Sequence, residues 1–346
     1  MLSEEEAVCL LSARTSSTSN VPRSSSYGER FNINALNDYE TRFYFRFWKR
    51  DLFRLFEALR LDSSYKLPNR AVFSGFEGLC ILLRRMAYPG RYGDLSRFFG
   101  QSAPIVCMIF NFMLGLVYDK YKCLLTIECG LLTSSRLEEY AAAVAQRGAP
   151  EPRCIGFIDG TVRAIARPTR NQKQVYNGHK RKHALKYQGV MAPDGLFIDF
   201  YGRTVGRRHD SWLLRQSGLL KRLPRVLHHD GELPYCIYGD PAYPLKPTLH
   251  VGFKGSNLSD TQKAFNAAMS KVRVAVEWGF GGIIRLWPFL DLRLSQRLYL
   301  SPVGKHYLVG VLLTNFRNCT NPNQISKFFS IKPPSLEEYL SLATTN

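Results

Sequence analysis

Residues 237–244 read IYGDPAYP, a short apolar run that ends on an acid and is then broken twice by proline. The run at 235–239 predicts a buried strand, and Asp240 before Pro241 is ordinary turn chemistry. A second acid, Asp159, follows the unbroken apolar run at 154–158 in the same way. Each acid alone is explained more simply as a turn residue. Together they suggest two strands of one sheet that present carboxylates at the same edge.

The rest of the middle region predicts more strands and then helices. Residues 184–192 and 196–201 flank Pro193-Asp194-Gly195, where proline presets the first turn position and glycine takes the positive φ that closes a hairpin. A helix should follow Asp210 or Ser211 as its cap, and a long helix should run from the capping box of Ser259 and Gln262 to about residue 287. This order predicts an α/β fold, with a mixed sheet flanked by helices.

The N-terminal third has a helical pattern after a polar start. Residues 12–30 are Ser-rich with little apolar content, which predicts a disordered tail. Apolar residues recur at helical spacing from 45 to 59, and further helices are expected at 76–88, 94–99 and 102–121. The last two resemble the layout of a helix-turn-helix, but the second carries no Arg or Lys before Lys120. We therefore interpret this region as a small helical domain that supports the fold; a module that reads DNA bases is the less favoured alternative.

Composition limits the partners. The chain has 346 residues, 47 Lys and Arg against 28 Asp and Glu, and a net charge of +19, which favours nucleic acid over a small neutral substrate. The eight cysteines show no CxxC pair and no zinc-like spacing, and His179 and His183 have no third ligand beside them, so no zinc site is predicted. The acidic start differs from a signal peptide, and the longest apolar run, 105–118, is short for a bilayer. We expect a reducing compartment, the nucleus or also the cytoplasm, and no membrane.

A third acid lies on the predicted long helix. Asn266, Ser270, Arg273, Glu277 and Gly281 form a polar or small stripe, and Glu277 is the only acid on it. The simpler explanation is a surface pair with Arg273, four residues back. If Glu277 instead meets Asp159 and Asp240, their like charges require a cation, and an all-oxygen cluster suits Mg²⁺ or Mn²⁺. Two such ions support in-line cleavage of a phosphodiester.

Basic residues gather after Asp159. Residues 151–230 hold sixteen Lys or Arg against six Asp or Glu, so this region could clamp a phosphate backbone, although a solvated basic loop would look the same. Our candidate DNA-binding residues are Arg163, Arg167, Tyr176, Asn177, His179, Lys180, Arg181, Lys182, Lys186 and Arg273. Asp210, with His209 before it, is a candidate accessory acid, but we favour a role as the helix cap.

Several of these segments resemble the DDE-type endonuclease family that includes the PIF/Harbinger transposases and their domesticated nuclease relatives. The resemblance rests on IDGT at 158–161, GDPAYP at 239–244 and RVAVEWGFG at 273–281, with YNGHKRKHALKYQGV, GRRHDSW and PVGKHYLVGVLLTNF in support. It covers most of the chain from about residue 41. The Arg273-to-Glu277 spacing is also similar to a bacterial insertion-sequence signature, whose tyrosine and lysine are replaced here by Ser270 and Ile284.

The resemblance implies an RNase H-like core in which Asp159, Asp240 and Glu277 bind two divalent ions and cleave DNA. It divides the chain into a disordered tail at 1–38, a helical domain at 39–145, an RNase H-like DDE nuclease domain at 146–320 and a C-terminal extension at 321–346. It also implies DNA as substrate, with strand transfer, a Myb-like DNA-binding partner and homo-oligomers as further expectations. Two alternatives stay open: a domesticated DNA-binding protein without cleavage, and an RNA-cleaving relative.

Overall fold

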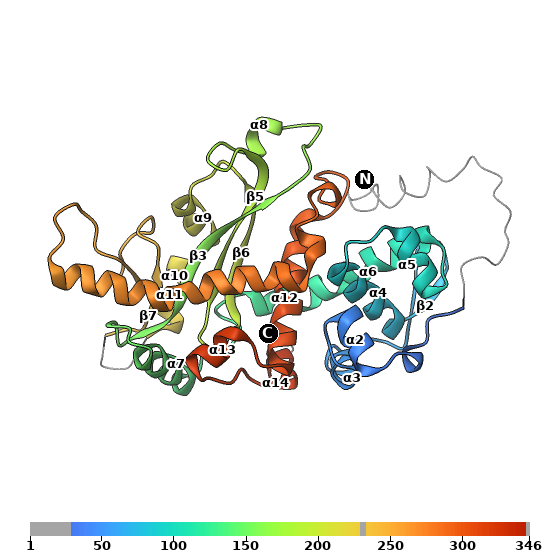
Figure 1. Cartoon of the computed structure of the whole chain (residues 1–346), viewed down its shortest axis with the longest axis horizontal. Helices are drawn as coiled ribbons and strands as arrows, with labels where there is room; N and C mark the ends of the chain where they lie inside the picture. Colours follow the sequence, from blue (N-terminus) through green and yellow to red (C-terminus); the bar gives the residue numbers. More distant parts are fainter. Residues whose placement is uncertain (1–28, 229–232, 344–346) are drawn as a thin grey trace. The chain divides into compact units, whose positions relative to one another are not determined.

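The apolar run before Asp240 forms a central strand of a six-stranded sheet. The structure is a computed structural model that describes residues 29–228 and 233–343 (Figure 1). The strands of the sheet are β3 (Cys154–Ala164), β4 (Tyr176–Asn177), β5 (Lys182–Met191), β6 (Phe197–Val205), β7 (Cys236–Gly239) and β8 (Leu249–Val251).

The sheet is mixed, as predicted. Its order is β4-β5-β3-β7-β8, and β6 also pairs with β5. The β3, β5 and β6 strands are antiparallel neighbours, whereas β7 runs parallel to both β3 and β8. The prediction that the first strand ends at Asp159 was wrong, because β3 continues to Ala164 through its pairing with β5.

The turn between β5 and β6 forms where the Pro-Asp-Gly triplet predicted it. The Gly195 N–H donates to the Ala192 carbonyl at 3.0 Å, and Gly195 has a φ of +85°, which favours glycine. Asp194 is fully buried in this turn, where it accepts hydrogen bonds from the Tyr140 hydroxyl and the Leu196 N–H. Burial raises the pKa of Asp194 to about 6, although these donors and Arg136 oppose the shift.

Helices pack on the sheet through aromatic side chains. The long helix α11 (Asp260–Leu286) runs across the strands (Figure 1), and its Phe280 ring contacts Phe197 at 5.3 Å between centroids. The predicted capping box is confirmed, since Ser259 and Gln262 exchange backbone-to-side-chain hydrogen bonds. Further helices of this part are α7 (Ser134–Gln146), α8 (Gln172–Val175), α9 (Asp210–Ser217) and α10 (Leu219–Val226).

The C-terminal segment is part of the same core. The Asn315 side chain accepts from the Phe197 N–H and donates to its carbonyl, and Asn318 donates to the Gly195 carbonyl. Asn323 donates to the Asp194 carbonyl. The β5–β6 turn is therefore fixed by α12 (Val303–Thr320) and, from the region predicted as an extension at 321–346, by Asn323. The helices of that region are α13 (Gln324–Phe329) and α14 (Leu336–Ser341).

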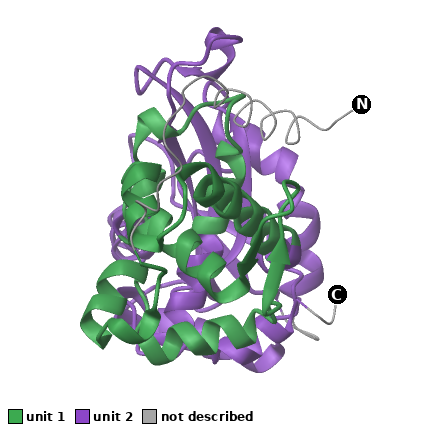
Figure 2. Cartoon of the chain, turned by 90° about the vertical axis from the view of Figure 1, so that its right-hand side faces the viewer, with its two compact units in different colours: residues 1–119, 286–310 green, residues 120–285, 311–346 purple. Residues whose placement is uncertain are grey.

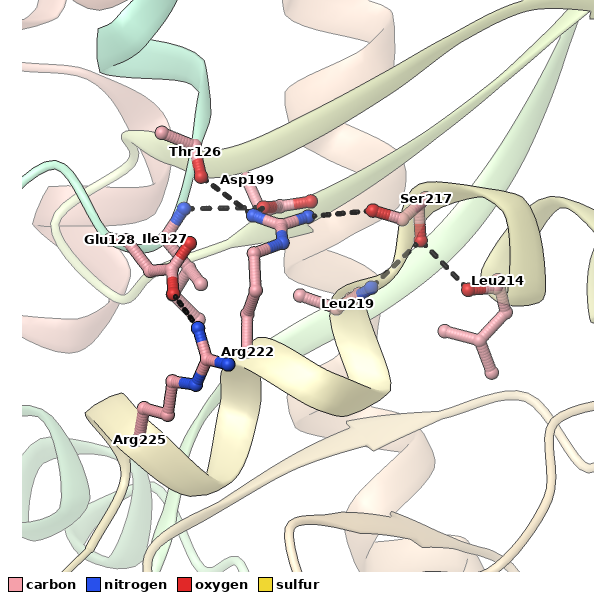
Figure 3. Close-up of polar contacts among 9 residues, drawn as sticks. All are labelled: Thr126, Ile127, Glu128, Asp199, Leu214, Ser217, Leu219, Arg222 and Arg225. Carbon is pink, nitrogen blue, oxygen red and sulfur yellow. Dashed lines mark hydrogen bonds and ion pairs between the residues drawn. The ribbon is translucent and has the colours of Figure 1, made fainter.

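A buried ion pair joins the sheet to the helix pair that follows it (Figure 3). Arg222 on α10 donates to Asp199 on β6 and, at 2.6 Å, to the Thr126 hydroxyl. The Ile127 N–H also donates to Asp199, at 3.2 Å. Removal of either charge would leave the other buried and uncompensated, which costs about 3 to 5 kcal/mol.

The chain divides into two compact units, coloured separately in Figure 2. Unit 2 comprises residues 120–285 and 311–346 and contains the sheet; unit 1 comprises residues 1–119 and 286–310. The helical part expected at 39–145 thus also includes residues from the C-terminal half. The elements of unit 1 are η1 (Ile33–Ala35), α2 (Asp38–Phe45), α3 (Lys49–Ala58), β1 (Ser64–Lys66), β2 (Val72–Ser74), α4 (Gly75–Ala87), α5 (Tyr92–Phe99), most of α6 (Ala103–Tyr121), η3 (Pro288–Leu290), η4 (Arg293–Ser295) and the start of α12; η2 (Lys122–Leu125) opens unit 2.

Unit 1 differs from the expectation in three ways. The helix expected at 45–59 is two helices, α2 and α3, because Arg46 takes a φ of +68° between them. The unit is not entirely helical, since β1 and β2 pair as a small hairpin. Most of the predicted tail, residues 1–28, lies outside the described residues, but residues 33–35 form the 3₁₀ helix η1, with Ile33 buried.

The apolar helix α6 is only partly buried. One face, including Val106, Phe110 and Met113, is fully buried, but only 33% of its most apolar window is buried. By length and composition alone, the segment Ala103–Leu125 is apolar enough to cross a membrane, contrary to the prediction that no run is. One such helix is weak evidence, because core helices of soluble proteins pass the same test.

We predict that Asp194→Asn flattens the pH dependence of stability. Because the pKa of Asp194 is raised in the folded state, its protonation stabilises the fold fully below pH 3.8, the usual pKa of an aspartate. This stabilisation, about 3 kcal/mol of unfolding free energy, is lost as pH rises through about 6. Asparagine cannot ionise, so the variant should not lose this stability. The unfolding free energy of the variant minus that of wild type should therefore increase by about this amount from pH 4 to pH 7. Chemical denaturation at each pH measures this, and the exposed Asp260→Asn is the control. Parallel curves for wild type and Asp194→Asn would contradict the assignment.

Candidate active site

Two acids meet at one edge of the sheet because β3 and β7 are parallel neighbours. Ile158 lies opposite Gly239 in the last pair of these two strands. The residues that follow, Asp159 and Asp240, therefore lie side by side where the pairing of β3 with β7 ends. The Asp159 carboxylate accepts the Gly160 N–H at 2.7 Å, and the Asp240 carboxylate accepts the Ala242 N–H at 2.7 Å. Asp240 is thus a turn residue as well as a candidate ligand.

Glu277 reaches this edge through Arg273 rather than directly. One nitrogen of the Arg273 guanidinium lies 3.3 Å from Asp159 Oδ2, and another lies 3.3 Å from Glu277 Oε1. The i,i+4 pair of Arg273 and Glu277 therefore exists, but the same arginine also joins α11 to β3. Glu277 remains half exposed, with 54% of its side chain accessible, whereas 26% of Asp159 is accessible.

The electrostatics of Asp159 show that the three acids influence one another. Burial raises the pKa of Asp159, and the charges of Asp240 and Glu277 raise it further. The Gly160 N–H and the Arg273 guanidinium oppose this shift. Arg273 therefore compensates part of the negative charge that the acids bring together.

A fourth acid, Asp210, lies next to Gly160, and it is not the helix cap we expected. His209 is the N-cap residue of α9, without a side-chain cap bond, and Asp210 is the first helical residue. The Asp210 carboxylate lies 3.0 Å from Lys186 Nζ on β5. A Cβ built on Gly160 would lie 2.8 Å from Asp210 Oδ1, so a larger residue at this position would require the Asp210 carboxylate to move.

Tyr243 is a site residue that our sequence reasoning missed. Its ring is buried, and burial together with the charges of Asp210, Asp159 and Asp240 raises the pKa of its hydroxyl. Within the described residues, this buried hydroxyl has no hydrogen-bond partner. An unpaired polar atom beside several carboxylates fits a place for a hydrated cation. The only sequence signal was its position in GDPAYP, three residues after Asp240.

The predicted DNA-binding residues divide into an exposed and a buried group. In Figure 1, α8 lies at the tip of the arm formed by β3 and β5. The exposed members of this arm are Arg167, Tyr176, His179, Lys180 and Arg181, together with Arg170 and Lys173. Arg163 and Lys182 are half-buried.

Three other predicted contacts already have partners inside the protein. Asn177 is buried, its amide nitrogen donates to the Gly206 carbonyl, and its oxygen accepts the Lys180 N–H. These hydrogen bonds stabilise the arm, and a contact of Asn177 with DNA stays a prediction. Lys186 pairs with Asp210, and Arg273 pairs with two of the acids.

We predict that Arg273→Gln makes the protein less stable as pH rises from 4 to 7 in the presence of a chelator. Loss of the guanidinium should raise the pKa of Asp159 further, so the penalty of ionising Asp159 in the folded state grows, by on the order of 1 kcal/mol. Unfolding free energies across this range measure the effect. Lys271→Gln, an equal charge change at an exposed position of α11, should leave the wild-type profile intact. An identical profile for both variants would show that Arg273 does not compensate the acids.

Comparison with known proteins identifies the region that contains these acids. Residues 158–315 match the family described as DDE superfamily endonuclease. The chain is 26% identical over 150 residues to the protein ALP1-like of Arabidopsis thaliana, a match that covers 40% of this chain and 37% of that protein. It is 29% identical over 130 residues to a probable transposase for the insertion sequence element IS702 of Microchaete diplosiphon, which covers 37% of this chain and 45% of that protein.

These matches have a limited extent. The chain spans less than half the length of each of these relatives, and no solved structure matches it. The matched region nevertheless contains Asp159, Asp240, Glu277, the second part of β3 and all of β7. Over residues 158–315 this chain is therefore similar to the DDE superfamily endonucleases.

Proposed function

We propose that unit 2 is an RNase H-like nuclease core that cleaves phosphodiester bonds of DNA with divalent metal ions. The observation that carries this proposal is the position of Asp159 beside Asp240 on parallel strands, with Glu277 close enough to raise the pKa of Asp159. Such a partly desolvated group of carboxylates is stabilised by a cation. The match to DDE superfamily endonucleases over 158–315 supports the same chemistry.

The donor set suits Mg²⁺ or Mn²⁺. Asp159, Asp240 and Glu277 would supply carboxylate oxygens, which hard divalent ions prefer. Ions held by these carboxylates would supply activation of a water or 3′-hydroxyl and stabilisation of the leaving oxygen of a phosphodiester. The unpaired Tyr243 hydroxyl lies among the same charges and would donate to a ligand there.

The basic residues of the site would then have separate roles. Arg273 now neutralises Asp159 and Glu277, and ions bound to those acids would free its guanidinium to pair with a phosphate. Lys186 stays with Asp210 and holds α9 against β5. The exposed arginines and lysines of the β3–β5 arm would contact the DNA backbone, which positions the duplex without reading its sequence.

Finer assignments follow from the same proposal. The motifs IDGT, GDPAYP and RVAVEWGFG favour the PIF/Harbinger group, for which strand transfer, action in the nucleus, a Myb-like partner and homo-oligomers are expected. A second candidate is a DNA-binding protein without cleavage. The ion pair of the half-exposed Glu277 with Arg273 favours that alternative.

Metal binding should raise the melting temperature through Asp240. With Mg²⁺ or Mn²⁺ at 100 times the dissociation constant, wild type should gain about 2.7 kcal/mol, or roughly 5 to 10 °C. Asp240→Asn keeps an oxygen for the Ala242 N–H but loses the charge, so its gain should disappear. Asp260→Asn, exposed at the start of α11, should respond like wild type. Equal increases in melting temperature for all three proteins would show that Asp240 does not bind the metal.

Cleavage should require Asp159. Purified protein incubated with supercoiled plasmid and Mn²⁺ should produce nicked circles on a gel, and Asp159→Asn should slow this by at least about 100-fold. A parallel incubation with duplex RNA tests the RNA-cleaving alternative. Retained DNA binding with no nicking by wild type would favour the non-cleaving protein, and equal nicking by Asp159→Asn would contradict the proposed centre.

A further inference from the structure

A second cluster of metal-ligand residues lies at the other end of β7. Ligand atoms of Glu151, Cys236 and His250 all lie within 4.8 Å of one another. Cys236 is the first residue of β7, and Asp240 follows the last, so about 13 Å of strand separates this cluster from the carboxylates. The cluster therefore does not belong to the candidate active site.

The spacing of the cluster is close to that of a zinc site. Bonds of 2.0–2.3 Å from nitrogen, oxygen or sulfur to a tetrahedral zinc ion place the ligand atoms about 3.3 to 3.8 Å apart. His250 Nδ1 lies 2.8 Å from Glu151 Oε2, and the thiol of Cys236 lies within 4.8 Å of both groups. A movement of about 1 Å or less would bring the three ligands onto one ion.

Of the two acidic ligands, Glu151 is already ionised, whereas Cys236 must lose a proton to bind a metal. The hydrogen bond with His250 lowers the pKa of Glu151, so this carboxylate is charged at neutral pH. The Arg153 guanidinium lies 3.7 Å from the other carboxylate oxygen of Glu151, Oε1, so Arg153 and His250 contact different oxygens of this carboxylate. A hydrogen bond to Cys154 and burial raise the pKa of the Cys236 thiol, so it holds a proton that a metal ion would displace.

The cluster is buried but can be reached from solvent. Cys236 is inaccessible, whereas 21% of the His250 side chain and 11% of the Glu151 side chain are accessible. Cys154, on β3, lies directly opposite Cys236 in the strand register, and both cysteines are free. The ligands come from β7, β8 and the residues just before β3, so one ion would join three neighbouring segments of the sheet.

We propose that Glu151, Cys236 and His250 bind one zinc-class ion at the amino-terminal end of β7. Thiolate and imidazole favour Zn²⁺ over Mg²⁺, so this site would select a different ion from the carboxylates at the opposite end. The ion would fix the register of β3, β7 and β8, and hence the placement of Asp159 and Asp240. This role does not depend on whether the protein cleaves DNA.

Cobalt(II), a spectroscopic substitute for zinc, tests the proposal. The full chain, reduced and freed of metal with a chelator, is titrated with Co²⁺ alone while thiolate-to-metal charge-transfer absorption is recorded. We expect one thiolate-bound ion per chain, displaced by Zn²⁺ but not by excess Mg²⁺. Cys236→Ser should abolish the band, and His250→Gln should weaken Co²⁺ binding by at least tenfold.

Controls separate this site from the other one and from folding defects. Asp159→Asn and Asp240→Asn should retain the band, as should Cys123→Ser, which changes a half-buried cysteine outside the cluster. Melting curves in chelator verify that each variant is folded, and the partly accessible His250 gives a milder variant if Cys236→Ser fails to fold. Absence of the band in wild type, or a band unchanged in both Cys236→Ser and His250→Gln, would overturn the proposal.

Discussion

The parallel pairing of β3 with β7 is the interaction on which the site depends. It places Asp159 next to Asp240 at one sheet edge, where burial and like charge oppose the ionisation of Asp159. The fold keeps this arrangement by supplying positive charge from other elements: Arg273 from α11 and, for the neighbouring Asp210, Lys186 from β5. These basic residues offset part of the negative charge of the acids, and under the proposed function bound ions would leave Arg273 free to pair with a phosphate.

The elements around this edge hold it rigid. Phe280 of α11 packs on Phe197 of β6, which fixes the helix that carries Arg273 and Glu277 against the sheet. Asn315, Asn318 and Asn323 saturate the backbone of the β5–β6 turn, so the C-terminal helices are structural members of the core. If the zinc-class site at Cys236 exists, the same strand would be fixed at one end by a structural ion and would present a second kind of ion at the other.

Much of this could be predicted from local sequence, and the failures have physical causes. Apolar runs, the Pro-Asp-Gly turn and the Ser259–Gln262 capping box located the mixed sheet and α11 because each is a local signal. The C-terminal end of β3 and the cap of α9 were predicted wrongly. Pairing with β5 extends β3 past Asp159, and α9 begins one residue earlier than expected, so that Asp210 is its first residue and pairs with Lys186. The contact of Arg273 with Asp159 and the Glu151–Cys236–His250 cluster join residues from separate elements, so no sequence spacing indicates them. Asn177 looked like a ligand-facing polar residue, but its burial depends on the fold of the arm.

The central claim is that Asp159 and Asp240 share divalent cations, with Glu277 completing their coordination. A crystal of the protein grown with Mn²⁺, with anomalous diffraction recorded at the manganese edge, tests it most directly. The account predicts anomalous peaks between the Asp159 and Asp240 carboxylates, with the Arg273 guanidinium displaced from Glu277. A well-ordered crystal in saturating Mn²⁺ with no peak at this edge, and Arg273 still bound to both acids, would contradict it.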